Sequence, residues 1–328
     1  MVKIWKDNDV SLDIIKNQTI GIIGYGIQGK AQANNMKDSG LNVIIGLNEN
    51  GNSWKVAKKH GHVVMSIEKA CEQSDIIHIL IPDMVQADVY NNKIINNIQN
   101  GNALSFSHGA AIHCKWINPP KNADIIMIAP KGPGSKVRET YLNGFGTPSI
   151  IAVEQDYTNT AWDRALAISK AIGSTKVGVI RTSFQEEVET DWFGEQADLC
   201  GGTASMIINA FETLVEEGYQ PEIVYFEVLH ELKLIVDMIQ RYGIVGMYKR
   251  VSETARFGGL TRGPLIMNQA NKQQMKLVLK MIKDGTFNDE WVSQYKKYGH
   301  DSFDEHLSKI ENHQVELVGK KIRKMIWG

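Results

Sequence analysis

The chain has 328 residues, of which 43% are hydrophobic and 22% charged, and its formal net charge is −1. This composition is that of a globular protein with room for two domains, and the balanced charge argues against nucleic-acid or anionic-membrane partners. No apolar run approaches the ~18 residues of a membrane span, and the amino-terminal segment lacks the apolar stretch of a signal peptide. Because the three cysteines form no C-x-x-C motif, we expect a reducing, cytoplasmic location.

The amino-terminal part of the chain alternates apolar runs with helix-compatible segments. The runs are rich in Ile and Val, which is typical of strands buried on both faces. The predicted strands are Thr19–Gly24, Asn42–Gly46, Asp75–Ile81, Ala103–Ser107, Asp124–Ala129, Ser149–Val153 and Lys176–Ile180. The predicted helices are Gln28–Ser39, Ser53–His60, Met84–Asn97 and Thr158–Ala171. This alternation predicts an α/β domain built on a doubly wound parallel sheet.

The pattern changes near residue 182, after which no segment is typical of a strand. The predicted helices here are Glu186–Glu217, Pro221–Tyr242, Asn271–Asp284, Asn288–Lys297 and Phe303–Lys324. Gly218 and Pro221 are the stop and start signals expected between the first two. We therefore predict two domains, residues 1–182 with the sheet and residues 183–328 with helices alone.

A glycine-rich loop follows the first predicted strand. Its sequence, Gly24-Tyr25-Gly26-Ile27-Gln28-Gly29, matches G-x-G-x-x-G between a strand and a helix. In that context the glycines permit a tight turn, close approach to a pyrophosphate and close helix packing, and the helix N-terminus offers N–H groups to phosphate. The loop predicts a Rossmann-type dinucleotide site, and the alternative is a purely structural turn.

The residues after the second predicted strand leave the choice of dinucleotide open. Glu49 lies where an acidic side chain would bind the ribose hydroxyls of NAD. Ser53 and Lys55 could instead bind a 2′-phosphate, although Ser53 could equally cap the following helix. A second loop facing the cofactor is expected after the third strand, because ligands bind outside the carboxyl ends of strands. That loop contains Asp83, Met84, Val85 and Gln86.

Two pairs of carboxylates stand at helical spacing in the second domain. Asp191 and Glu195 form one pair, and Glu227 and Glu231 form the other. Residues four apart lie on the same face of a helix, where like charges repel, and the apolar neighbours here make bare charge costly. Oxygen ligands in this arrangement suit Mg²⁺. The alternative is two solvated acidic helix faces.

Other candidate site residues occupy loops and helix ends. His108 and Lys131 each follow a predicted strand directly, on the ligand side of the sheet, where His108 could transfer protons or serve as a structural side chain. Gly134 belongs to a stiff loop suited to backbone contact with a ligand. Ser252 is typical of a helix N-cap. Cys200 lies one turn after Glu195 and is expected to pack as a small side chain; it is also a candidate substrate contact.

Together these segments resemble ketol-acid reductoisomerase, the acetohydroxy acid isomeroreductase of branched-chain amino-acid synthesis, in its short class I form. The resemblance covers essentially the whole chain and rests on several motifs. They are G-Y-G-I-Q-G, S-H-G, I-A-P-K-G-P-G, E-T-D-W-F-G-E-Q-A-D-L-C-G-G and F-E-V-L-H-E-L.

The resemblance implies a magnesium- and NADPH-dependent enzyme that acts on 2-acetolactate or 2-aceto-2-hydroxybutyrate. It implies that the two carboxylate pairs together bind two Mg²⁺ ions. It also implies that Glu231 takes part in catalysis and that Ser252 contacts the substrate carboxylate. It further implies that His108 and Lys131 line the site. The family's helical domain is knotted, a rare topology. Its site is completed by a second subunit, so a homodimer is the smallest expected assembly and a dodecamer stays open.

One departure concerns the cofactor. Asn48 stands where NADPH-using members commonly carry arginine, the better phosphate ligand, and Gly51 replaces a common serine. We expect NADPH, with use of NADH open. Two other functions are weighed: a metal-free 3-hydroxy acid dehydrogenase, which would need a lysine base rather than four carboxylates, and an NAD(P)-binding redox sensor without turnover.

Overall fold

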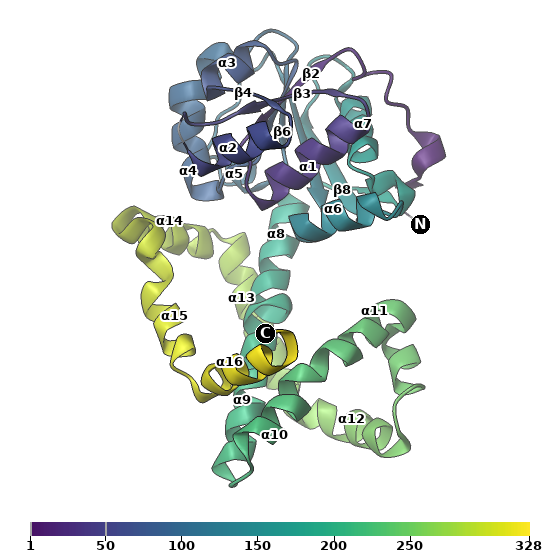
Figure 1. Cartoon of the computed structure of the whole chain (residues 1–328), viewed down its shortest axis with the longest axis vertical. Coiled ribbons are helices and arrows are strands. Elements are labelled where there is room, and N and C mark those ends of the chain that lie inside the picture. Colours follow the sequence, from purple (N-terminus) through teal and green to yellow (C-terminus); the bar gives the residue numbers. More distant parts are fainter. Residues whose placement is uncertain (1, 50) are drawn as a thin grey trace. The chain divides into compact units, whose positions relative to one another are not determined.

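The computed structural model describes residues 2–49 and 51–328. The chain divides into two compact units, Met1–Thr190 and Asp191–Gly328. Within the described residues, the first unit contains all the strands and the second contains only helices (Figure 1). Helix α8 (Phe184–Gly194) runs across the boundary. None of the described helices has the length and apolar character needed to cross a membrane.

The first unit is built on one nine-stranded sheet with the order β1-β9-β8-β7-β6-β5-β2-β3-β4. The strands are β1 (Ile4–Trp5), β2 (Thr19–Ile23), β3 (Asn42–Gly46), β4 (Val63–Met65), β5 (Ile76–Ile79), β6 (Ala103–Phe106), β7 (Asp124–Pro130), β8 (Ser149–Gln155) and β9 (Val179–Arg181). Most neighbours are parallel, but β7–β8 and β1–β9 are antiparallel. The prediction of an α/β domain on a doubly wound, mainly parallel sheet is confirmed. The two antiparallel pairs were not predicted, because apolar runs do not encode strand direction.

Helices cover the sheet, and the structure adds several to those predicted. They are α1 (Ile27–Asp38), α2 (Asn52–Lys59), α3 (Ile67–Glu72), α4 (Asp83–Val89), α5 (Ala110–His113), α6 (Gly134–Leu142) and α7 (Ala161–Ala171). Helices α3, α5 and α6 and strands β1 and β4 were not predicted, since each is short or begins in a loop rich in Gly and Pro. The predicted strand Lys176–Ile180 has the wrong bounds. Ser174–Lys176 is a 3₁₀ turn, and strand β9 begins only at Val179.

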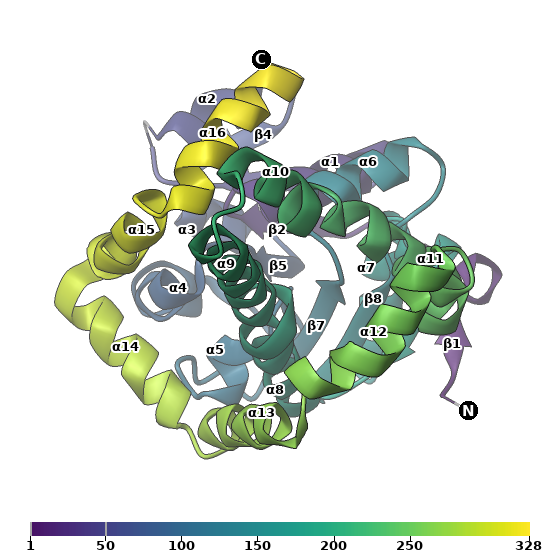
Figure 2. The same ribbon diagram turned by 90° about the horizontal axis from the view of Figure 1, so that it is seen from below.

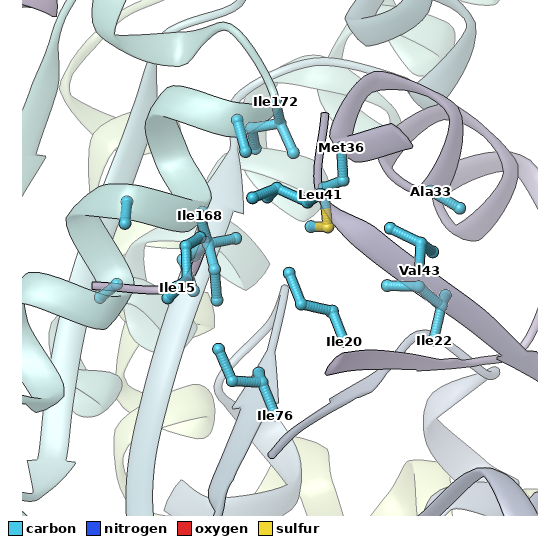
Figure 3. Close-up of a cluster of buried hydrophobic side chains, with 14 of the residues drawn as sticks. Ile15, Ile20, Ile22, Ala33, Met36, Leu41, Val43, Ile76, Ile168 and Ile172 are labelled. Carbon is cyan, nitrogen blue, oxygen red and sulfur yellow. The ribbon is translucent and has the colours of Figure 1, made fainter. Parts of the chain in front are cut away.

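The sheet separates two apolar cores, as a doubly wound fold requires. Ile22 belongs to the same buried cluster as Met36 of α1 and Ile168 of α7, shown in Figure 3. The next residue, Ile23, points to the opposite face and packs with Ile67 of α3, because successive side chains of a strand alternate. Each fully buried Ile contributes about 1.5–3 kcal/mol to stability, so the paired cores fix the strand register on which the loops depend.

The sheet also brings the candidate loops together. Strands β2, β3, β5, β6 and β7 are mutually parallel, so the loops that follow them emerge at one edge. These loops carry the glycine motif, Asn48, Asp83, His108 and Lys131. Ligands of open α/β sheets bind at this carboxyl edge, so the fold supports a site here.

The second unit consists of helices. They are α9 (Gly201–Glu216), α10 (Pro221–Tyr225), α11 (Leu232–Tyr248), α12 (Glu253–Ile266), α13 (Gln269–Lys283), α14 (Thr286–Tyr298), α15 (Asp304–Glu311) and α16 (Gln314–Trp327). The predicted helices are mostly present but divided. π-Helical turns at Glu195–Leu199 and Phe226–His230 interrupt the first two, and Gly243 (φ 73°) kinks α11. The apolar periodicity continues through such turns, so it does not reveal them.

The core of the helical unit is small. Figure 2 shows α9, α10 and α16 side by side, and Phe211, Tyr225 and Ile322 from these helices are buried together. Gly319 allows the close approach of α16 to α10, since a Cβ there would lie 2.6 Å from the Tyr225 ring. By contrast, helices α11 and α12 leave many large apolar side chains exposed.

Candidate active site

The glycine loop has the geometry that dinucleotide binding requires. Gly24 adopts φ +104°, and a Cβ there would lie 2.6 Å from the Leu80 carbonyl oxygen. A Cβ on Gly29 would lie 2.5 Å from the Gly24 carbonyl oxygen. A Cβ on Gly26, by contrast, would meet nothing within 4 Å. The first and third glycines are therefore required by packing, whereas the second leaves open space at the start of α1 for a pyrophosphate.

The loop after β7 is tied directly to the glycine loop. Gln28 Nε2 donates a hydrogen bond to the Gly132 carbonyl oxygen at 3.0 Å. A Cβ on Gly134 would lie 2.4 Å from the Ile27 carbonyl oxygen, so only glycine permits this approach. The Ile27 side chain is 73% exposed and offers an apolar surface beside the phosphate position. These contacts place predicted cofactor residues from two distant segments together.

Replacement of Gly134 by alanine is expected to weaken dinucleotide binding. The added methyl group cannot fit without moving the glycine loop, and overpacking of this kind typically costs about 1–3 kcal/mol. Titration with NADPH should give a raised Kd, accompanied by a lower Tm. Gly258→Ala is the matched control, because a Cβ at that position of α12 meets nothing within 4 Å; equal losses in both variants would contradict the close-packing role.

The loop after β3 carries the residues expected at the adenosine end. Asn48 is exposed, and its Oδ1 accepts a hydrogen bond from Lys93 Nζ at 2.8 Å. Ser53 lies in the first turn of α2, whose N-cap is Gly51, so the prediction that Ser53 could cap this helix is wrong. Residue 50 lies outside the described residues. The Tyr25 side chain turns inward and shares a hydrogen bond of 2.9 Å with His60 Nδ1.

The loop after β5 forms the second wall expected for the cofactor. Asp83, Met84 and Val85 are partly exposed in the first turn of α4, whereas Gln86 is buried. Gln86 Nε2 donates to the Asp83 carboxylate at 3.0 Å and to the Ile81 carbonyl oxygen at 3.1 Å. Gln86 therefore stabilises the conformation of the loop through these hydrogen bonds. Asp83, Met84 and Val85 are the residues with accessible surface for a cofactor.

A buried carboxylate organises the two polar residues that follow β6 and β7. His108 Nδ1 lies 3.0 Å from Glu187 Oε2, and Lys131 Nζ donates to Glu187 Oε1 at 2.9 Å. The Gly109 backbone N–H also donates to Glu187, at 2.9 Å. The Glu187 side chain is only 1% exposed. Both predicted residues are therefore fixed at the ligand edge of the sheet by one acid on α8.

Glu187 is ionised despite its burial. Burial by itself would raise the pKa of this carboxyl group, but the hydrogen bond and charge of His108, together with those of Lys131, outweigh burial and lower it below its ordinary value. The carboxylate is thus negatively charged at neutral pH and orients an imidazole and an ammonium group. Sequence reasoning missed Glu187; its only signal was its position four residues before Asp191.

The first carboxylate pair continues along the same helix. Asp191 follows Glu187 by one turn of α8, and residues at this spacing share a helix face. Glu195 begins the π-helical turn that follows α8. Cys200 caps the carboxyl end of this turn and is exposed in the described chain, which does not match the packing expected of a small side chain; its role as a substrate contact stays a prediction.

The second carboxylate pair lies in a hollow of the helical unit. Glu227 lies within the π-helical turn Phe226–His230 and Glu231 directly follows it, and both line a hollow of about 550 Å³ together with Ser252. Ser252 Oγ accepts a hydrogen bond from the Ala255 N–H at 3.1 Å, which confirms its predicted place as the N-cap of α12. Arg250 lines the same hollow and was not predicted. Acidic oxygens, a hydroxyl and a guanidinium group are thus gathered in one place.

These donor sets fit a divalent cation in their chemistry. Both pairs offer carboxylate oxygens, which Mg²⁺ prefers. Among the described residues, no cluster of three or more such ligands includes Glu227 or Glu231. The second pair is therefore an incomplete ligand set among the described residues. Asp191 of the first pair, by contrast, clusters with His108 and Glu187, with ligand atoms within 4.8 Å of one another, as a possible metal site.

Comparison with known proteins decides the family. A family model described as "Acetohydroxy acid isomeroreductase, NADPH-binding domain" matches residues 14–178, and one described as "Ketol-acid reductoisomerase, C-terminal domain" matches residues 184–327. The chain belongs to the ketol-acid reductoisomerase family. The family and the enzyme class predicted from the sequence are thereby confirmed: this reductoisomerase is both an oxidoreductase and an isomerase.

Individual relatives agree along their whole length. A "Ketol-acid reductoisomerase (NADP(+))" of Nitrosopumilus maritimus is 70% identical, covering 100% of this chain and 98% of the relative. One of Methanocaldococcus jannaschii is 54% identical, covering 99% and 98%. The solved structure of an NADH-preferring ketol-acid reductoisomerase from an uncultured archaeon superposes with a TM-score of 0.95 at 45% identity, covering 99% of this chain and 100% of that one.

Proposed function

We propose that this reductoisomerase converts 2-acetolactate or 2-aceto-2-hydroxybutyrate into the corresponding 2,3-dihydroxy acid, using NADPH and two Mg²⁺ ions, in the synthesis of branched-chain amino acids. The observation that carries the proposal is the fixed position of His108 and Lys131 around Glu187, with Asp191 one turn further along α8. A cytoplasmic location accords with three free cysteines.

Asp191, Glu195, Glu227 and Glu231 are the residues that would hold the metal ions. When bound, Mg²⁺ polarises substrate oxygens and NADPH supplies hydride. The hydroxyl group of the substrate must lose its proton before the alkyl group moves to the neighbouring carbonyl carbon. Glu231 is the proposed group for proton transfer, because it lies in the hollow beside Ser252.

Other polar side chains of the two units are proposed to bind the substrate and to stabilise the charge that develops on it. Ser252 and Arg250, which both line the hollow, would bind the substrate carboxylate, since a guanidinium group matches carboxylate geometry. His108 and Lys131 would orient the substrate oxygens and stabilise negative charge that develops on them. Glu187 would act through these two residues as a positioning group.

Product analysis tests the reaction directly. The chain is incubated with 2-acetolactate, Mg²⁺ and NADPH, and the carbon skeleton of the product is determined by NMR. The proposal expects a 2,3-dihydroxy acid with a migrated methyl group. Reduction of the substrate without migration would instead favour a dehydrogenase, and NADPH binding without any product would favour a sensor.

We also propose that two subunits complete each site, which would supply the further ligands that Glu227 and Glu231 lack among the described residues. The helical unit exposes Ile244 and Val245 on α11 and Phe257, Leu265 and Ile266 on α12, each more than 60% accessible. Exposed apolar patches of this kind mark protein–protein interfaces, and a knotted helical domain could present them to a second copy.

The mass of the protein in solution is expected to be at least twice 36.7 kDa. Light scattering coupled to size-exclusion chromatography measures it, and a dodecamer would appear as a larger multiple. A monomer that turns over 2-acetolactate would contradict the shared site.

A further inference from the structure

The loop after β3 receives a cation from a distant segment. Lys93 lies in the π-helical segment that follows α4 and donates a hydrogen bond through Nζ to Asn48 Oδ1 at 2.8 Å. The two residues are 45 positions apart in the chain. The Lys93 side chain remains 35% exposed, so its ammonium group is available for a further contact.

This position is the one from which a cofactor ribose is recognised. In a doubly wound fold the end of the second strand meets the adenosine ribose, where an acid suits a free 2′-hydroxyl and a cation suits a 2′-phosphate. Asn48 and Glu49 are the first exposed residues after β3. Neither carries positive charge, so a phosphate here needs its cation from another element. Lys55 on α2 is exposed, whereas Lys93 contacts this loop directly through Asn48.

We propose that Lys93 is the residue that recognises the 2′-phosphate of NADPH, with Asn48 as its positioning partner. The inference rests on the proposed function, because it assigns a specificity residue to the same cofactor site. An ammonium group binds phosphate as a point charge. The Asn48 amide fixes that charge beside the ribose position while its own NH₂ group stays available to donate.

Glu68 opposes this role. Its carboxylate on α3 lies 4.0 Å from Lys93 Nζ, and both side chains are partly exposed. A carboxylate this close competes with a phosphate for the ammonium group and repels the phosphate itself. The charge balance between Lys93 and Glu68 therefore sets how strongly the chain prefers NADPH over NADH.

Binding without turnover tests the proposal. The full chain is titrated with NADPH and with NADH, without substrate, and each Kd is measured from the change in nicotinamide fluorescence. Lys93→Met should raise the Kd for NADPH about tenfold or more, as expected for loss of one charge-assisted phosphate contact, and change the Kd for NADH less than about twofold. Lys93→Arg should retain the preference. Lys69→Met on α3 is the matched control, because that exposed lysine lies beside Glu68 in sequence.

Two further measurements separate phosphate recognition from loop support. Competition by 2′,5′-ADP should weaken in Lys93→Met, whereas competition by 5′-AMP should not. Glu68→Gln should lower the Kd for NADPH and leave that for NADH unchanged. An equal loss of affinity for NADPH and NADH in Lys93→Met, or no loss of affinity for either, would overturn the proposal. Because no turnover is required, failure of the 2-acetolactate assay would overturn the proposed function and leave this result standing.

Discussion

Replacement of Glu227 by glutamine is expected to reduce turnover of 2-acetolactate at least about 100-fold, while NADPH should still bind. Loss of a partner that merely orients a metal ligand already costs 10–100-fold, and Glu227 is proposed as a ligand itself. The amide keeps the size of the side chain but removes the charge in the hollow it shares with Glu231. The rate is measured over a range of Mg²⁺ concentrations, and the apparent Mg²⁺ requirement should rise.

A neighbouring acid supplies the control for that result. Glu222 is exposed at the start of α10, five residues before Glu227 and outside the hollow. Glu222→Gln should leave rate and Mg²⁺ requirement unchanged. Normal kinetics of Glu227→Gln at low Mg²⁺ would remove the second carboxylate pair from the metal site.

Replacement of Glu187 by glutamine is expected to lower both activity and stability. The change removes a buried charge that accepts from His108, Lys131 and the Gly109 N–H. The amide of glutamine keeps part of these hydrogen bonds, and Lys131, about one-third exposed, regains water. The expected loss is therefore close to that of one hydrogen bond to a charged group, about 1.5–3 kcal/mol. Urea unfolding measures it, and kcat should fall because the two site residues lose their fixed orientation. Glu186 is an exposed neighbour on α8, so Glu186→Gln should lower neither kcat nor the free energy of unfolding.

The same carboxylate gives the stability a pH dependence of known sign. Its pKa is lower in the folded chain than its ordinary value of 4.5. The unfolded chain therefore binds the proton more readily, so the stabilisation is present above pH 4.5 and is lost as the pH falls through the lower folded pKa. Acid unfolding of the native chain should show this loss, and Glu187→Gln should show less of it. Identical acid transitions would mean that Glu187 is not held ionised by its partners.

Local sequence patterns predicted those helices and strands whose own residues show the apolar periodicity of the element. Runs such as Asn42–Gly46 are Ile- and Val-rich because both faces of the sheet are covered, and this run is strand β3 without change. Helix α6 was missed because it begins at Gly134, where glycine is required by contact with Ile27 rather than by the helix. The antiparallel direction of β8 is defined by its pairing with β7, and the residues of β8 alone do not indicate it.

The candidate site divides in the same way. Spacing alone marked the glycine loop and both carboxylate pairs, because four-residue and G-x-G-x-x-G spacings are local. Glu187 could not be assigned, since its role depends on segments 56 and 78 residues away in sequence. The contact of Lys93 with Asn48 is likewise tertiary. Residues that act through distant partners require the structure.

The most direct test of the account is NADPH oxidation with 2-acetolactate, with and without Mg²⁺, repeated with NADH. We predict turnover that requires Mg²⁺ and is faster with NADPH than with NADH, as an enzyme with carboxylate metal ligands and Lys93 at the ribose would show. Turnover that is unchanged when Mg²⁺ is removed by chelation, or the absence of turnover while NADPH binds, would contradict the central claim.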